Sequence, residues 1–131
     1  MRVGTDLVLI ERFKDFAENT RKLGRILTAS EIEYVATKRG KNPVNAKKNP
    51  PEVNTIAGLY ASKEAVLKAL GIGVNNGVGF KDVEILHDDY GAPYVVLYRN
   101  AKKWFENLKM KEIAINITHD GDFAHAICII A

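Results

Sequence analysis

The sequence predicts an α+β fold in which a mainly antiparallel sheet packs on one long helix. Helical patterns dominate the first half of the chain, and the clearest covers residues 54–70, where alanine recurs every four residues. Short apolar runs separated by polar turns dominate the second half, which favours β-hairpins. For 131 residues we expect one compact domain, residues 1–131, with no room for a second.

The first half is predicted to hold a strand and two helices before the long helix. Residues 2–10 predict a strand, because most of them are branched or apolar, namely Val3, Leu7, Val8, Leu9 and Ile10. A helix with one apolar and one charged face is expected to follow through Leu23. The next helix is expected to begin at Thr28, because Thr28 and Glu31 match a capping box. Glycine, asparagine and proline then predict an exposed loop over residues 40–51.

The long helix is followed by shorter elements. Its row of small residues allows close packing, and it ends at a glycine-rich segment, residues 71–79. An antiparallel hairpin is predicted over residues 83–97, and Asn100 is expected to cap a short helix. Alternating apolar and polar residues predict a second hairpin over residues 113–130.

Composition excludes several classes of protein. The chain is 47% hydrophobic and 27% charged, which fits neither a disordered nor a membrane protein, and we expect no secretion signal. Cys128 is the single cysteine, so an internal disulfide is ruled out and a reducing compartment, the cytoplasm, is the expected location. Residues 34–51 contain five basic residues and no acidic one, which indicates a contact with an anion.

Four residues are candidates for a metal or phosphate site. Glu64 and Lys68 lie four residues apart on one helix face, with Lys63 beside them, and such a pair is commonly a solvated salt bridge. Asp6 lies in an apolar strand, where a carboxylate is costly to bury unless it pairs with an arginine or binds a metal. The more specific interpretation is a magnesium ion bound by both Asp6 and Glu64.

Other motifs are weaker indications of function. Thr118 and His119 end an apolar strand, where a ligand can reach them, although a histidine at a turn is more often a surface residue. The sequence contains no Walker phosphate loop, no CxxC or HExxH metal motif and no GxSxG motif. Covalent catalysis by a serine or cysteine nucleophile is therefore not expected.

Five segments in order resemble the holo-acyl-carrier-protein synthase family, the small, trimeric class of the 4′-phosphopantetheinyl transferases. Gly4-Thr5-Asp6 followed by Arg12 looks like the family's opening glycine-x-aspartate strand followed by arginine, and the segment around Lys63-Glu64-Ala65 with Lys68 is similar to its defining helix. The five matching segments are residues 3–12, 25–31, 61–71, 91–93 and 115–119. The resemblance departs at Leu59-Tyr60, where the family usually has arginine and phenylalanine.

The resemblance implies a reaction and its partners. The reaction is transfer of the 4′-phosphopantetheine group of coenzyme A to a serine of apo acyl carrier protein, which releases adenosine 3′,5′-bisphosphate and supports fatty acid biosynthesis. Mg²⁺ is the implied cofactor, and the implied assembly is a homotrimer with active sites between subunits. Neither nucleic acid nor a membrane is an expected partner.

The resemblance also implies residue roles. Asp6 and Glu64 would bind Mg²⁺, and Lys68 would contact the pyrophosphate with support from Lys63, so that Glu64, Lys68 and Lys63 form the catalytic set. The coenzyme would contact basic, loop and strand-end residues, namely Lys38, Arg39, Lys68, Gly71, Pro93, Thr118 and His119. Arg12 and Arg21 would face the acidic carrier protein.

Two alternatives stay open from the sequence. A basic nucleic-acid-binding module would explain the pI near 9.0 and the basic stretch, but aromatic residues are not interleaved with its lysines as a stacking platform requires. A catalytically inactive homologue would explain the departures around Leu59, although all the polar residues expected to be essential are present.

Overall fold

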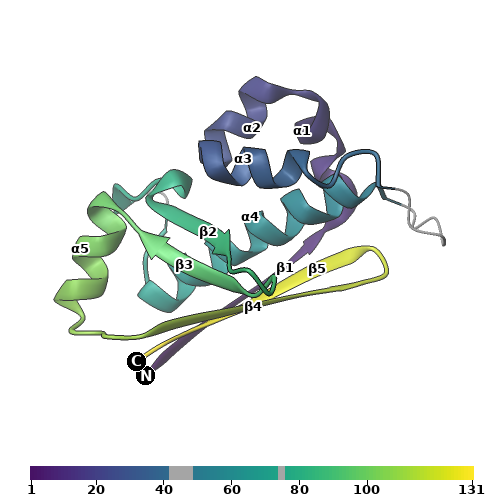
Figure 1. Ribbon diagram of the computed structural model, residues 1–131. Coiled ribbons are helices and arrows are strands. Elements are labelled where there is room, and N and C mark those ends of the chain that lie inside the picture. The colour runs from purple at the N-terminus through teal and green to yellow at the C-terminus, as the bar shows by residue number, and fades with distance from the viewer. Residues whose placement is uncertain (42–48, 74–75) are drawn as a thin grey trace.

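The computed structural model describes residues 1–41, 49–73 and 76–131, and its core is a sheet packed on a long helix. Figure 1 shows the sheet on one side of helix α4 and three short helices on the other, with both termini close together. The sheet is antiparallel with strand order β1–β5–β4, and a separate pair of strands, β2 and β3, forms a hairpin. The bounds are β1 Arg2–Leu9, α4 Pro51–Leu70, β2 Val83–His87, β3 Pro93–Leu97, β4 Ile113–Asp120 and β5 Phe123–Ile130. The predicted α+β fold is confirmed.

Small residues bring the sheet close to α4. On β5, Ala124, Ala126 and Cys128 alternate with outward-facing residues and are fully buried, because they face the helix. Burial raises the pKa of the Cys128 thiol to about 12. Small side chains on the strand facing the helix permit a short distance between the two backbones.

Gly4 is where β1 lies closest to α4. A Cβ atom at this position would lie 2.0 Å from the Ala65 carbonyl oxygen and 2.5 Å from the Ala69 nitrogen, so only glycine fits. Beside it, the Arg2 side chain donates a hydrogen bond to the Ala69 carbonyl at 2.8 Å. Asp6 follows two residues later on the same face of the strand and is therefore directed toward the helix.

The first helix of the prediction is divided in the structure. The helix expected through Leu23 is interrupted at Asn19, whose extended backbone separates α1 from α2 and whose side chain caps α2 by accepting from the Lys22 amide. The predicted capping box of Thr28 and Glu31 is confirmed at the start of the next helix. The bounds are η1 Ile10–Phe13, α1 Lys14–Glu18, α2 Thr20–Ile26 and α3 Ala29–Ala36.

The long helix begins three residues earlier than predicted. Pro51 occupies its first turn, where a missing amide hydrogen costs nothing, and Gly71 ends it with a left-handed backbone, φ 76°. Of the predicted loop over residues 40–51, residues 42–48 lie outside the described part of the chain. In the described ranges no helix combines the length and apolar character needed to span a bilayer.

Both predicted hairpins are confirmed, and the capping role of Asn100 is wrong. Helix α5, Arg99–Asn107, is preceded by Tyr98 as its N-cap, and the Asn100 amide instead donates to the Gly77 carbonyl at 2.8 Å. This bond ties the glycine-rich segment to α5. A short 3-10 helix, η3 Phe80–Asp82, leads from that segment into β2.

The Gly4 contact predicts a strong effect of Gly4→Ala. Because the added methyl group would overlap the backbone of α4, we expect the free energy of unfolding to fall by about 2–3 kcal/mol in urea denaturation. Gly24→Ala in α2 is the matched control, since no described atom lies within 4 Å of a Cβ placed there. Alanine favours the helix at that position, so the control should be unchanged or slightly more stable. Equal stabilities of the two variants would contradict the close approach at Gly4.

Candidate active site

The structure brings Asp6 on β1 together with Lys68 on α4. The Lys68 Nζ atom lies 3.0 Å from Asp6 Oδ1 and 3.0 Å from the Thr5 carbonyl oxygen. The Asp6 side chain is 14% exposed and that of Lys68 is 53% exposed. The other carboxylate oxygen, Asp6 Oδ2, is buried and has no hydrogen-bond partner among the described residues. An unpartnered buried carboxylate oxygen is costly, which favours a bound cation at this point.

Glu64 lies one helical turn before Lys68 on the same face. Burial and the negative charge of Asp6 raise the pKa of the Glu64 carboxyl, while Lys68, a hydrogen bond from Tyr60 and the charge of Arg12 lower it. The carboxylates of Asp6 and Glu64 therefore repel each other, and the Lys68 ammonium group partly offsets this repulsion. A cation held between the carboxylates would relieve their repulsion.

This pair of carboxylates fits a magnesium ion. Hard oxygen donors suit Mg²⁺, which is commonly held by one or two carboxylates with water and phosphate oxygens at its other positions. In the part of the chain that the structure describes, no group of three His, Cys, Asp or Glu side chains could hold a metal.

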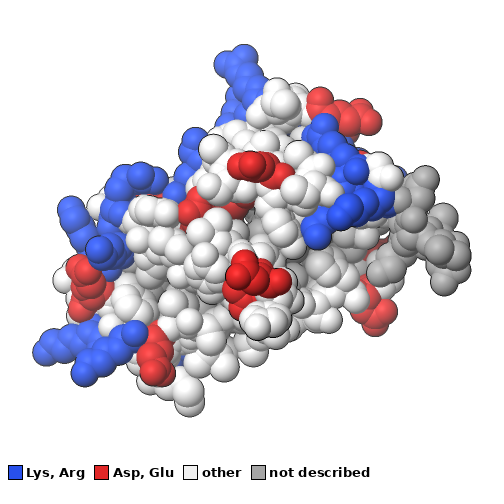
Figure 2. All heavy atoms as spheres, viewed as in Figure 1, with Lys and Arg blue, Asp and Glu red and all other residues white. Residues whose placement is uncertain are grey.

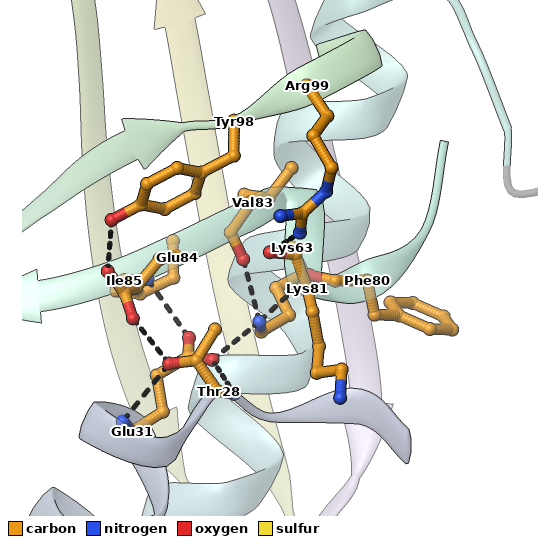
Figure 3. Close-up of polar contacts among 10 residues, drawn as sticks. All are labelled: Thr28, Glu31, Lys63, Phe80, Lys81, Val83, Glu84, Ile85, Tyr98 and Arg99. Atoms are coloured by element: carbon orange, nitrogen blue, oxygen red, sulfur yellow. Dashed lines mark hydrogen bonds and ion pairs between the residues drawn. The ribbon is translucent and has the colours of Figure 1, made fainter. Parts of the chain in front are cut away.

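The structure does not bring Lys63 together with Asp6 and Glu64. Its side chain is fully buried, and its Nζ atom donates to Glu31 Oε1 at 2.6 Å, to the Phe80 carbonyl at 2.9 Å and to the Val83 carbonyl at 2.7 Å (Figure 3). These bonds occupy all three donors of the ammonium group. Burial lowers the pKa of Lys63, and the Glu31 carboxylate opposes that effect. Neighbouring residues on a helix point about 100° apart, so Lys63 and Glu64 face different surroundings.

The Lys63–Glu31 pair belongs to a larger buried network that the sequence analysis missed. The Glu31 carboxylate also accepts from the Thr28 and Ile85 amides, and Glu84 accepts from the Thr28 hydroxyl and from the Tyr98 hydroxyl (Figure 3). The network fastens α3 and the β2–β3 hairpin to α4. The capping-box pattern revealed Glu31, but not that its side chain has a second, long-range partner.

A pocket of about 200 Å³ lies at the other edge of the sheet, beside β4. Gly58 and Leu59 of α4 and Ile117 and His119 of β4 line it, together with Pro93. His119 Nε2 lies 2.9 Å from the Asn54 carbonyl oxygen, which fixes the orientation of the ring. Thr118, by strand alternation, lies on the outer face of the sheet, away from this pocket.

Two further residues line the same pocket and were not predicted. Tyr34 and His87 stack face to face with their ring centroids 4.0 Å apart, and the Lys38 ammonium lies 4.8 Å from the Tyr34 ring centroid. Burial and the charge of Lys38 lower the pKa of His87. A single histidine in a strand gives no sequence signal of such a contact, which joins residues far apart in the chain.

The remaining predicted residues are dispersed. Arg39 donates to the Ala17 carbonyl at 2.8 Å. Arg12 lies over the rings of Phe13 and Tyr60, and Arg21 is exposed on α2. Gly71 lies at the end of α4, one turn beyond Lys68 in the chain.

Comparisons with known proteins agree on one family. Residues 2–128 match the model of the 4′-phosphopantetheinyl transferase superfamily. The chain is 41% identical over 127 residues to a holo-[acyl-carrier-protein] synthase of Caldicellulosiruptor saccharolyticus, covering 97% of this chain and 93% of the relative. It is 35% identical to a protein of that name from Geobacter metallireducens, covering 97% and 94%.

Solved structures agree in fold. The Helicobacter pylori holo-[acyl-carrier-protein] synthase in complex with coenzyme A matches with a TM-score of 0.76 and 28% identity, over 98% of this chain and 99% of that one. The Neisseria meningitidis synthase matches with a TM-score of 0.79 and 28% identity, over 99% and 97%.

The contrast between Lys63 and Lys68 predicts different effects of the same substitution. Lys63→Met would leave the Glu31 carboxylate buried without its cation, so we expect the free energy of unfolding to fall by about 3–5 kcal/mol. Lys68→Met removes an ammonium group that is itself 53% exposed from its contact with Asp6, and should change stability by about 1 kcal/mol or less. Urea denaturation of both variants measures the difference, and equal losses would contradict the structural role of Lys63.

Proposed function

This chain belongs to the 4′-phosphopantetheinyl transferase superfamily, and we propose that it transfers the 4′-phosphopantetheine group of coenzyme A to a serine of apo acyl carrier protein. The observation that carries the proposal is the meeting of Asp6, Glu64 and Lys68 from two distant segments at the contact between β1 and α4. The names of the relatives and the coenzyme A complex of the Helicobacter pylori protein support the same reaction.

In the proposed reaction a new bond forms between the serine oxygen and the phosphorus next to pantetheine. The bond from that phosphorus to the bridging oxygen of the pyrophosphate breaks, and adenosine 3′,5′-bisphosphate leaves. The serine proton is lost, and Glu64 is one group near enough to the site to accept it. Lys68 would neutralise charge on the pyrophosphate, since its half-exposed ammonium is held only by Asp6 and the Thr5 carbonyl among the described residues.

Magnesium dependence is part of the proposal. The unpartnered Oδ2 atom of Asp6 and the raised pKa of Glu64 support these two carboxylates as its ligands. When bound, Mg²⁺ would supply positive charge that stabilises the pyrophosphate in the transition state. The two carboxylates then serve to hold the cation and to fix its position relative to Lys68.

The coenzyme is proposed to extend from this site to residues at the β4 edge. The pocket there has apolar walls at Leu59 and Pro93, which suit a planar base, and His119 at its rim. Lys38 lies next to it and is the nearest cation we propose for the ribose phosphate. Thr118, Arg39 and Gly71 remain proposed contacts, on the strength of the family resemblance alone.

The carrier protein is proposed to dock where Arg12 and Arg21 are exposed. Arg12 lies on η1 and Arg21 on α2, and Figure 1 shows α2 on the side of α4 that faces away from the sheet. An acidic partner would therefore approach Glu64 from there. On the face in Figure 2, basic side chains are scattered among acidic ones and form no continuous stripe, which does not favour nucleic-acid binding. A cytoplasmic role in fatty acid synthesis follows from the proposed reaction.

We further propose a homotrimer with active sites between subunits. The carboxylates lie at the β1 edge of the sheet, and the pocket lies at the β4 edge. If the β1 edge of one subunit faced the β4 edge of its neighbour, one coenzyme molecule could contact both. The outer face of the sheet exposes large apolar side chains, among them Val3 at 60% and Leu7 at 61%. Such a face is typical of a surface covered by other subunits.

The transfer reaction is tested by intact-mass analysis of an apo acyl carrier protein incubated with the enzyme, coenzyme A and Mg²⁺. We expect a mass gain of one phosphopantetheine, which EDTA abolishes and Glu64→Gln slows by at least about 100-fold. Glu106→Gln, an exposed carboxylate on α5, is the matched control and should be as active as the wild type. No mass gain with any of several carrier proteins would favour the inactive-homologue alternative.

The assembly is tested by analytical ultracentrifugation. We expect a trimer for the wild type and a monomer for Leu7→Glu, because charge repulsion and desolvation oppose burial of three carboxylates in one interface. Tyr90→Glu changes an exposed residue in the β2–β3 turn and should remain trimeric. A fully active monomeric wild type would refute shared active sites.

A further inference from the structure

Lys38 is a partly buried cation that no described anion neutralises. It lies two residues beyond the end of α3, where its backbone amide donates to the Val35 carbonyl at 3.0 Å. Its neighbours Thr37 and Arg39 are exposed, whereas Lys38 is partly covered. Within the described residues its ammonium group has neither a hydrogen bond nor an ion pair, so its three donors are available to a ligand.

The ring of Tyr34 holds this ammonium group in place. Lys38 Nζ lies 4.8 Å from the Tyr34 ring centroid, within the distance at which a cation is attracted to an aromatic ring. The His87 ring stacks on the same tyrosine, with the centroids 4.0 Å apart and the planes 9° from parallel. The stack therefore fixes the orientation of the ring that Lys38 contacts.

The stack is in turn held by the buried network. Glu31, three residues before Tyr34 on α3, accepts from the Ile85 amide at 3.0 Å, and Ile85 lies two residues before His87 on β2 (Figure 3). Three residues of a helix rise by about 4.5 Å and two residues of a strand by about 6.6 Å. The two elements thus advance by similar distances from this hydrogen bond to the stack, and the bond fixes the register in which the two rings meet.

The stacked rings form a common wall of two pockets. Tyr34 and His87 line both the pocket of about 200 Å³ beside β4 and a second pocket of about 430 Å³, which Lys38 also lines. Burial and the charge of Lys38 lower the pKa of His87, and Asp88 opposes the effect. At neutral pH the imidazole is therefore largely uncharged and does not repel the ammonium group.

We infer that Tyr34 is a positioning residue, whose ring holds the Lys38 ammonium group where it meets the 3′-phosphate of the coenzyme. A free lysine side chain has many rotamers and loses that freedom when it binds a phosphate. A ring that already holds the ammonium group lowers this cost, and so favours ligands that carry the phosphate over ligands that lack it. The inference deepens the proposed function, because it rests on the proposed coenzyme site and on Lys38 as its phosphate contact.

The experiment compares two ligands that differ only in that phosphate. Isothermal titration calorimetry gives the Kd for adenosine 5′-phosphate and for adenosine 3′,5′-bisphosphate, and the first divided by the second is the discrimination ratio. We expect Tyr34→Leu to lower this ratio about fivefold, by weakening binding of the bisphosphate alone. Tyr34→Phe keeps the ring and should keep the wild-type ratio, because the ring and not the hydroxyl contacts Lys38.

Tyr94→Leu is the matched control. Tyr94 also lines the second pocket, and no cation of the described residues lies over its ring, so the ratio should stay at the wild-type value. A purely structural effect of losing a tyrosine would weaken both ligands together and leave the ratio unchanged.

His87→Leu tests the same inference from β2, since it removes the ring that supports Tyr34. We expect it to lower the ratio about twofold. A wild-type ratio in both Tyr34→Leu and His87→Leu would overturn the inference, and so would a loss in Tyr34→Phe equal to that in Tyr34→Leu.

Lys38→Met separates the inference from the proposed function. We expect it to lower the discrimination ratio about tenfold or more, because it removes a charged hydrogen-bond donor to the phosphate. If Lys38→Met keeps the wild-type ratio, or if the wild type does not prefer the bisphosphate, Lys38 does not bind this phosphate and the inference is overturned. Transfer of phosphopantetheine by the wild type in the mass assay would then leave the proposed reaction standing.

Discussion

The contact between two backbones at Gly4 is the constraint on which the rest of this structure depends. A strand can lie directly on a helix only where neither contributes a bulky side chain, and Gly4, Ala65 and Ala69 meet that condition from both sides. The short separation brings Asp6, two residues further along the strand, within reach of Lys68 and beside Glu64. The same glycine therefore permits both the close packing of β1 on α4 and the position of Asp6 beside Lys68 and Glu64.

Two adjacent residues of α4 have different roles, because Lys63 stabilises the fold and Glu64 belongs to the candidate active site. Lys63 is directed into the protein, where it joins α3 and the β2–β3 hairpin through Glu31 and two carbonyl groups. Glu64, on another side of the helix, is close enough to Asp6 for the negative charge of Asp6 to raise its pKa. A buried ion pair carries a large desolvation cost, and here the additional hydrogen bonds to both partners offset it. The rigid attachment of α4 to its neighbours in turn limits how far Glu64 can move.

Local signals in the sequence predicted most of the fold and part of the site. The capping box at Thr28, the long alanine-rich helix and both hairpins depend on residues close together in the chain, and they were found. The break at Asn19 was missed because apolar spacing continues across it. Helical spacing could not tell that Lys63 is buried, and the stack of Tyr34 on His87 joins separate elements without any local pattern. Contacts of that kind are decided by tertiary packing.

The buried Cys128 has a consequence under the proposed function, because coenzyme A and its pantetheine arm both end in a free sulfhydryl. Exchange between a sulfhydryl and a disulfide needs a thiolate, and the Cys128 thiol, with a pKa of about 12 and no exposure to solvent, forms almost none at neutral pH. The folded chain therefore presents no thiolate that could attack the disulfide of oxidised coenzyme A. Under oxidative stress the protein would not become covalently trapped by its proposed substrate.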